Sequence, residues 1–338
     1  MQNLEKIRTE FQEILAKPIR ELGLKLEGSA VERFVQRLYR ELQAKGLHKF
    51  RPHCYLTDEW GCPSGEPVVG IPFYLASAEL SQLEHEMNDL EDDREIMMYM
   101  RHEAGHAFNY AYQLYKSAEW GDLFGPFRRA YRDHYRPVPF SREFVRHMAG
   151  WYAQKHPDED FAETFAVWLT PRAQWRKRYQ GWGALAKLEY VDRMARKVGD
   201  TEPSRRRGHT DVTVDEMEST VGEFYRLSLP EEEISIQDLG LDTDLADIFN
   251  ISGKRRKGVR PAQEMLQQHR KHIVDKVAYW SGVQRPIVKR LVEAICKRVE
   301  DLGLRVDIRR EADYLTEFTV YTTALSMNYL VRGKFIYP

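Results

Sequence analysis

The sequence of 338 residues contains few cysteines and no long apolar run. Cys54, Cys62 and Cys296 are its only cysteines, and so small and odd a number argues against a disulfide framework and suits a reducing compartment. No stretch approaches the roughly 20 consecutive apolar residues that a membrane-spanning helix needs. The opening segment MQNLEKIRTEFQEILAKPIR carries charges throughout, unlike a secretory signal. We therefore expect a cytoplasmic protein with no membrane partner.

The sequence also lacks a charge excess and several common catalytic motifs. Basic side chains number 51 and acidic ones 52, which gives a formal net charge of −1. A balanced charge produces no general attraction to polyanions, so we expect no nucleic-acid partner. There is no P-loop, no GxGxxG motif and no GxSxG motif. The sequence therefore does not indicate a P-loop nucleotide-binding protein, a dinucleotide-binding fold or a serine hydrolase.

What the sequence does contain is a series of helical patterns around short strand-like segments. Helices are expected at residues 3–16, 29–45, 94–115, 158–170, 183–197, 261–279, 285–302 and 311–331, and strands at 50–57, 67–75 and 304–309. The polar residues 199–212 suggest a domain boundary or a surface linker. We therefore expect an α+β fold with a catalytic domain over residues 1–207. Residues 208–338 would form a mostly helical accessory domain of unknown role. Binding of a protein partner is one candidate role for it.

The most informative motif is HExxH, formed by His102-Glu103-Ala104-Gly105-His106. Histidines four residues apart lie on one face of a helix, one turn from each other, and can bind the same metal ion. Glu103 lies beside them and can take a proton from a water molecule bound to that ion. Gly105 has no side chain, so backbone or substrate can approach the helix there. This pattern predicts a Zn²⁺ site with His102 and His106 as ligands and Glu103 as the catalytic base.

An HExxH pattern also occurs by chance in unrelated proteins. A chance match, however, need not lie on a helix and need not have a third ligand elsewhere. Here the motif lies within a long helical pattern, and residues 158–170 form a second apolar helix with several carboxylates. Glu159 and Glu163 share a face of that second helix, and a buried helix seldom carries carboxylates that have no partner. Glu159, Glu163, Asp158 and Asp160 are the candidates for the third ligand.

A resemblance narrows this choice. The segment WYAQKHPDEDFAETFAVWLTP, together with RHEAGH, resembles the family of "putative zinc-binding metallopeptidases", a zincin-like group of the gluzincin type. The part EDFAETF is also similar to the third-ligand helix of anthrax lethal factor. In gluzincins the first carboxylate of an E-x-x-A-[D/E] pattern binds zinc, the alanine permits close helix packing, and the second carboxylate orients a ligand histidine. The resemblance therefore implies Glu159 as the third zinc ligand and Glu163 as the residue that orients a histidine.

The resemblance also implies a tyrosine that stabilises the oxyanion, one or two turns before the third ligand. Tyr152 lies seven residues before Glu159 and fits that place. The alternatives are that Tyr152 packs in the core with Trp151, or that the donor is Tyr131, His134, Tyr135 or His147. Proteins of this kind hold an extended peptide against an edge strand, for which residues 70–75 are the candidate.

Two functions are consistent with these residues. The first is a zinc metallopeptidase, which hydrolyses peptide bonds through a metal-bound water activated by Glu103 and takes a peptide or protein as substrate. The second is a zinc-binding scaffold or partner-binding protein without turnover. A scaffold needs the ligands but not a general base, so the presence of Glu103 favours the peptidase.

Overall fold

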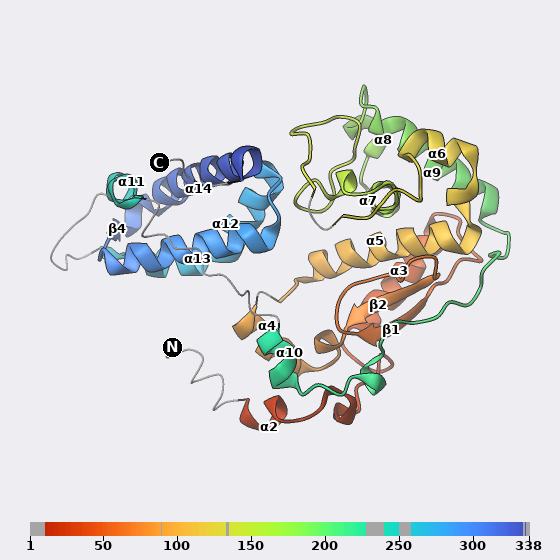
Figure 1. Ribbon diagram of the computed structural model, residues 1–338, viewed down its shortest axis with the longest axis horizontal. Coiled ribbons are helices and arrows are strands. Elements are labelled where there is room, and N and C mark those ends of the chain that lie inside the picture. Colours follow the sequence, from red (N-terminus) through yellow and green to blue (C-terminus); the bar gives the residue numbers. More distant parts are fainter. Residues whose placement is uncertain are drawn as a thin grey trace. The chain divides into compact units, whose positions relative to one another are not determined.

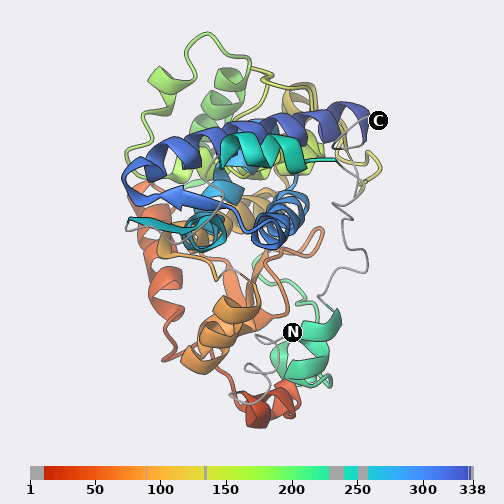
Figure 2. The same ribbon diagram turned by 90° about the vertical axis from the view of Figure 1, so that its left-hand side faces the viewer.

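The computed structural model describes residues 11–88, 90–132, 135–227, 240–249, 258–333 and 335 (Figures 1 and 2). The chain divides into two compact units. The first comprises Met1–Tyr135, Phe140–His147 and Tyr152–Leu229, and the second comprises Arg136–Pro139, Met148–Trp151 and Pro230–Pro338. The expected α+β class is confirmed. The assignment of a catalytic role to residues 1–207 and an accessory role to residues 208–338 stays a prediction.

The first unit is built mainly from helices around one small sheet. Its elements are α2 (Gln12–Leu15), η1 (Ile19–Leu22), α3 (Glu32–Ala44), β1 (His53–Thr57), β2 (Val68–Pro72), η2 (Phe73–Ala76), α4 (Ala78–Met87), α5 (Asp93–Tyr112), η3 (Leu114–Lys116), α6 (Ala118–Phe124), η4 (Tyr152–Gln154), α7 (Pro157–Leu169), α8 (Trp175–Arg178), α9 (Ala184–Val198), η5 (Val214–Glu216) and α10 (Val221–Leu227). The sequence patterns anticipated α3, α5, α7 and α9 but not the shorter α4 and α10.

Strands β1 and β2 pair in parallel, with Tyr55 opposite Gly70. The expected strand at residues 67–75 is correct only as far as Pro72, because Phe73–Ala76 forms a 3₁₀ helix. Gly70 exchanges both of its backbone hydrogen bonds with Gly61, at 2.7 and 3.4 Å. The bridge occupies the outer edge of β2 at Gly70 and residues 73–75 are helical, so residues 70–75 do not form one continuous edge strand. The expectation that this segment pairs with an extended substrate stays a prediction.

Helix α5 begins with two reciprocal hydrogen bonds. The Asp92 carboxylate accepts from the backbone N–H of Glu95 at 2.8 Å, and the Glu95 carboxylate accepts from the backbone N–H of Asp92 at 2.9 Å. Such a capping box satisfies backbone donors that a helix otherwise leaves unpaired. The helix ends where Gln113 adopts a positive φ of 53°. These bonds hold the long helix that carries the HExxH residues.

Helices α5 and α7 cross in close contact at Gly105. A Cβ atom added to Gly105 would lie 2.9 Å from Ala162 Cα and 3.0 Å from the Ala162 carbonyl oxygen. Glycine therefore lets the α7 backbone approach α5 directly, and the expectation that backbone approaches at Gly105 is confirmed. Every residue of α7 is buried. The crossing brings the carboxylates of α7 to the histidine face of α5.

A buried ion pair attaches α7 to α9. Lys187 Nζ lies 2.6 Å from Asp160 Oδ2 and donates to the Glu143 carbonyl oxygen at 2.8 Å. The Lys187 and Asp160 side chains are both buried. Lys187 thus links three segments of the first unit, namely α7, α9 and the loop that precedes Tyr152.

The polar residues after α9 lie along the sheet. Arg205 donates from its backbone N–H to the Ala111 carbonyl at 3.0 Å and pairs with Glu66 at 2.7 Å. The Thr57 hydroxyl donates to the Val212 carbonyl at 2.7 Å. The segment that suggested a linker is therefore fastened to α5, to the turn before β2 and to β1, and it groups with the first unit.

The N-terminal segment pairs with residues that follow this polar stretch. Ile19 and Arg20 donate from their backbone N–H groups to the carbonyls of Ser219 and Met217, at 3.0 and 3.1 Å. Helix α2 lies beside α10, as both views of the ribbon show. Most of the helix expected at residues 3–16 lies outside the described residues.

The second unit is a packed group of helices with a short antiparallel strand pair. Its elements are α11 (Asp242–Ile248), β3 (Val259–Pro261), α12 (Ala262–Ser281), α13 (Arg285–Asp301), β4 (Arg305–Asp307), η7 (Ile308–Arg310) and α14 (Glu311–Arg332). The three long helices, blue in Figure 1, match the helices expected from the sequence. Gly303 follows α13 with a positive φ of 61°, as expected for a residue that ends a helix. None of the described helices combines the length and hydropathy that a bilayer span requires.

Candidate metal centre

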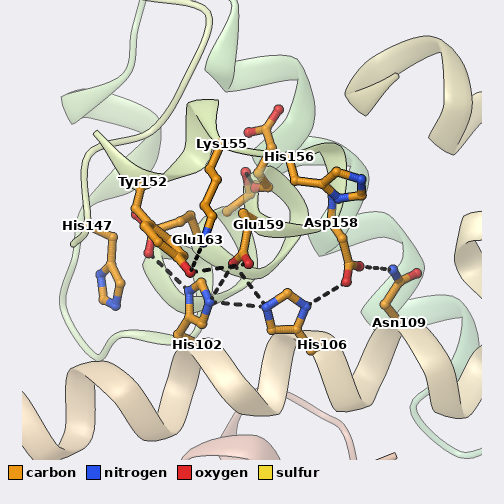
Figure 3. Close-up of polar contacts among 12 residues, drawn as sticks. His102, His106, Asn109, His147, Tyr152, Lys155, His156, Asp158, Glu159 and Glu163 are labelled. Atoms are coloured by element: carbon orange, nitrogen blue, oxygen red, sulfur yellow. Dashed lines mark hydrogen bonds and ion pairs between the residues drawn. The ribbon is translucent and has the colours of Figure 1, made fainter. Parts of the chain in front are cut away.

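The two motif histidines lie side by side on α5, and both are buried. The ring centroids of His102 and His106 are 4.8 Å apart. Their exposed fractions are only 2% and 7%. Figure 3 shows both rings projecting from one helix toward Glu159. The four-residue spacing therefore places both imidazoles at one point, as helix geometry requires.

Helix α7 brings Glu159 to the same point. Glu159 Oε2 lies 3.0 Å from His102 Nε2 and 3.2 Å from His106 Nε2. The two Nε2 atoms are themselves 3.1 Å apart. Three potential ligand atoms thus form a nearly equilateral triangle within the first unit.

The outer nitrogen of each histidine faces a carboxylate. His102 Nδ1 lies 3.1 Å from Glu163 Oε1, and His106 Nδ1 lies 2.9 Å from Asp158 Oδ2. If each Nδ1–H donates to its carboxylate, each Nε2 carries a lone pair that points into the triangle. Two nitrogen lone pairs and a carboxylate oxygen repel one another at about 3 Å unless a cation lies between them. The donor set therefore fits a bound metal ion.

The size of the triangle matches zinc. Bonds of about 2.0–2.2 Å at tetrahedral angles separate neighbouring ligand atoms by about 3.3 Å. The three observed separations, 3.0, 3.1 and 3.2 Å, are close to that value. Two histidines and one glutamate also form one of the ligand sets of catalytic zinc sites, which leave a fourth position for water or substrate. In the part of the chain that the structure describes, His102, His106 and Glu159 are the residues whose ligand atoms gather in this way.

The electrostatic surroundings also favour positive charge at this point. Burial alone would lower the pKa of both imidazoles because it disfavours their charged form. The hydrogen bonds of Glu159 and Glu163 outweigh burial and raise the pKa of His102 to about 9. Asp158 and Glu159 likewise raise the pKa of His106 well above its usual value. The carboxylates that raise these pKa values would also stabilise a divalent cation bound between the two Nε2 atoms.

Residues 70–223 match the model of a family described as "Putative zinc-binding metallo-peptidase". The resemblance to this family is therefore confirmed, and the gluzincin type stays a prediction. The matched residues include α5 and α7, which carry all three potential ligands. Comparisons with curated proteins and with solved structures give no match.

The segment that matches the family model contains a supporting network that the sequence did not reveal. Asp158 accepts a hydrogen bond from Asn109 Nδ2 at 2.9 Å and another from the Tyr110 hydroxyl. Asp158, one of the four candidates for the third ligand, instead lies behind His106 on its Nδ1 side. Asn109 and Tyr110 follow His106 by three and four residues, so their position on the same helix face was the available signal. Metal-binding histidines commonly have such partners, which set the tautomer and the ring orientation.

Glu103 is buried next to the two histidines, with an exposed fraction of 7%. Burial raises the pKa of its carboxyl group, and positive charge on His102 and His106 opposes that rise. Its carboxylate forms no hydrogen bond with any residue within the described ranges. It therefore differs from Asp158, Glu159 and Glu163, each of which is engaged by histidine.

Two tyrosines reach the other oxygen of Glu159. The Tyr131 hydroxyl donates to Glu159 Oε1 at 2.6 Å, and the Tyr152 hydroxyl lies 3.4 Å from the same atom. The two hydroxyls are 3.3 Å apart, and Lys155 Nζ lies 3.5 Å from the Tyr152 hydroxyl. A donor on Oε1 stabilises the orientation in which Oε2 faces the histidines. The shorter bond gives this role to Tyr131 and leaves Tyr152 less constrained.

His147 and Tyr135 are the other rival donors that the structure describes. His147 Nε2 lies 3.2 Å from the Met98 carbonyl oxygen, and burial lowers the pKa of this imidazole. The Tyr135 ring is 6.5 Å from the Tyr152 ring. His134 lies outside the described residues. Near the sheet, the Cys62 thiol donates to the Glu66 carbonyl at 3.2 Å, so it already has a hydrogen-bond partner.

Proposed function

We propose that this chain is a zinc-dependent peptidase that hydrolyses peptide bonds, with Glu103 as general base and general acid. The observation that carries the proposal is the triangle of His102 Nε2, His106 Nε2 and Glu159 Oε2, with separations of 3.0–3.2 Å. A buried carboxylate that no described histidine engages, that of Glu103, lies beside it on the same helix. A site that only held a metal ion would gain nothing from this fourth acidic group, because burying a carboxylate costs free energy.

His102, His106 and Glu159 would hold the metal. When bound, zinc lowers the pKa of a water molecule toward about 7 and polarises the substrate carbonyl group. Glu103 takes a proton from the attacking water at its carboxylate and then donates that proton to the leaving amine. The raised pKa of Glu103 suits both halves of this transfer, because a group that titrates nearer to neutral pH can accept and release a proton.

The surrounding residues would keep this arrangement in place. Glu163 orients the His102 imidazole and Asp158 orients the His106 imidazole, each through the Nδ1 atom of the ring. Tyr131 holds the outer oxygen of Glu159, and Tyr152 donates to the oxygen of the substrate carbonyl as negative charge develops there. Tyr152 suits that role because its contact with Glu159 is long and its ring lies 5.7 Å from the His102 ring.

Metal content is the first test. We expect about one zinc per wild-type chain by elemental mass spectrometry, and a large loss in the His106→Ala variant, provided that circular dichroism shows that the variant is folded. A wild-type protein that neither contains zinc nor takes it up on titration would contradict the proposal.

Glu103→Gln is the test of the catalytic role. We expect the variant to keep its zinc and to lose hydrolysis by roughly 10²–10⁴-fold, the contribution of a general base. The matched control is Glu119→Gln on α6, an exposed carboxylate paired with Arg193 away from the triangle. If Glu103→Gln cleaves peptides as fast as the wild type, Glu103 is not the base. If the wild type binds zinc but cleaves no peptide pool, the non-catalytic scaffold becomes the better description.

A further inference from the structure

The segment Pro126–Arg132 between α6 and α7 concentrates positive charge. It reads PFRRAYR, with three arginines and no acidic residue. Arg128, Arg129 and Arg132 are exposed. Their side chains form no ion pair or hydrogen bond with any residue that the structure describes, whereas Arg176 and Arg193 on α8 and α9 are paired with carboxylates. The three guanidinium groups therefore offer unused donors to a partner.

This segment is held against the candidate metal centre. The Tyr131 hydroxyl, between Arg129 and Arg132 in sequence, donates to Glu159 Oε1 at 2.6 Å. The Arg129 carbonyl oxygen lies 2.8 Å from Nε2 of His156, the residue that caps α7. The arginines are therefore attached to a backbone whose position is fixed next to the proposed zinc ligand.

A further positive charge, that of Lys155, lies beside Tyr131 of this segment. Lys155 Nζ lies 4.3 Å from the centre of the Tyr131 ring and 5.1 Å from that of Tyr152. Cations over aromatic faces are attracted by the ring electrons, so this ammonium group is held beside both tyrosines. The carboxylates below them, Asp158, Glu159 and Glu163, are already engaged by the histidines. The Lys155 charge opposes the rise in the pKa of Glu59 that burial causes, whereas Arg128, Arg129 and Arg132 form no ion pair with a carboxylate of the described residues.

We propose that Arg128, Arg129 and Arg132 recognise acidic side chains of the substrate, so that peptides rich in Asp or Glu near the cleaved bond are preferred. This inference rests on the proposed peptidase function. Guanidinium groups bind carboxylates through paired, charge-assisted hydrogen bonds and are weakly hydrated, which suits them to capture an acidic peptide. A nucleic acid is less suited, because binding along a phosphate backbone needs an extended basic surface and the whole chain has a net charge of −1.

Binding of matched peptides tests this preference without requiring turnover. Two fluorescent peptides of one sequence, with Glu at four positions in one and Gln at the same positions in the other, are titrated into the zinc-loaded Glu103→Gln protein. We expect the Glu peptide to bind roughly tenfold more tightly at low salt, and the difference to shrink as salt is raised. The Arg128→Gln/Arg129→Gln/Arg132→Gln variant should lose most of the difference.

The matched control is Arg40→Gln/Arg172→Gln/Arg207→Gln, which removes the same charge from exposed arginines elsewhere in the first unit. This control should keep the preference, and the melting temperatures of both triple variants should stay near that of the parent. Equal binding of the two peptides, absence of binding, or a preference that survives in the first triple variant would overturn the inference. So would competition by a single-stranded DNA oligonucleotide as effective as that by the Glu peptide. A preserved preference in a wild-type protein that cleaves no peptide would contradict the proposed hydrolysis while leaving the acidic-peptide surface intact.

Discussion

The two units bury different kinds of side chain. The first unit buries ionisable groups in its interior, among them Arg101, Lys187 and the acidic and histidine residues of the metal centre. In the described residues of the second unit, the buried polar side chains are the uncharged Ser281, Thr322 and Ser326. Burying a charge costs free energy unless the charge is paired or binds a metal. The concentration of such groups in the first unit therefore supports a chemical role there and a packing role for the core of the second.

Within the first unit, the buried charges serve two purposes. Arg101 pairs with Glu41 through two hydrogen bonds of 2.7 and 2.8 Å, and Lys187 pairs with Asp160. These two pairs attach α3 to α5 and α9 to α7, so they position the helices that carry the candidate ligands. The carboxylates around His102 and His106 instead influence which nitrogen of each imidazole carries a proton and how each ring is oriented.

The largest effect on stability is expected for Lys187→Met. This change leaves Asp160 buried without its cation, and we expect a loss of about 3–5 kcal/mol in the free energy of unfolding. Burial already raises the pKa of Asp160 to about 7 with Lys187 present, and removal of the ammonium raises it further. The unfolded chain then ionises at a lower pH than the folded one, so the loss should increase as pH rises.

Urea unfolding of Lys187→Met at two pH values measures this loss. The control is the double variant Lys187→Met/Asp160→Asn, which removes both charges and should recover part of the stability. If the single variant is as stable as the wild type, the pair does not position α7.

A smaller effect, on metal affinity, is expected for Asp158→Asn. Asparagine can still accept a hydrogen bond from His106 but no longer places a negative charge behind the imidazole. We expect zinc to bind about 10–100-fold more weakly, as for other residues that orient metal-bound histidines. Titration against a chelator measures the change, and Asp200→Asn, an exposed residue after α9, provides the control. Unchanged affinity would mean that Asp158 has no part in the site.

The pH dependence of zinc binding should follow from the raised histidine pKa values. The pKa of His102 is raised to about 9 without metal, so zinc must displace a proton below that pH. We expect the apparent affinity to rise with pH from neutral upward, roughly tenfold per pH unit for each proton displaced, until both histidines have lost the proton that zinc must replace. Calorimetry in two buffers of different ionisation enthalpy counts the protons released. An affinity independent of pH from neutral to about pH 9 would contradict this electrostatic description.

The smallest effect is expected in the second unit. Ser326 Oγ is buried on α14 and has no hydrogen-bond partner among the described residues. Replacing Ser326 by Ala removes an unsatisfied group, so the free energy of unfolding should change by less than about 0.5 kcal/mol or rise slightly. Thr322→Val on the same helix, which removes a hydroxyl that donates to the Phe318 carbonyl at 2.8 Å, serves for comparison. A large loss for Ser326→Ala would show that the second unit also depends on buried polar groups.

Local sequence was sufficient for the elements that carry the site. The spacing of His102 and His106 on one helix, and the apolar pattern of residues 158–170, depend on helix periodicity alone, so α5 and α7 could be predicted. The long helices of the second unit were predictable for the same reason. Short elements such as α4 and α10 were missed, because two or three turns carry too little periodic pattern to be distinguished from loops.

Tertiary structure decided which side chains meet. The contact of Asp158 with His106 and the attachment of Arg205 and Val212 to earlier segments of the first unit join residues far apart in sequence. No local pattern reports such pairings, because they depend on how closely two elements approach. The crossing of α5 and α7 at Gly105 and Ala162 illustrates what local sequence and tertiary contact each contribute. Helix propensity determined both helices, and steric contact between their backbones decided that the histidines of one face the carboxylates of the other.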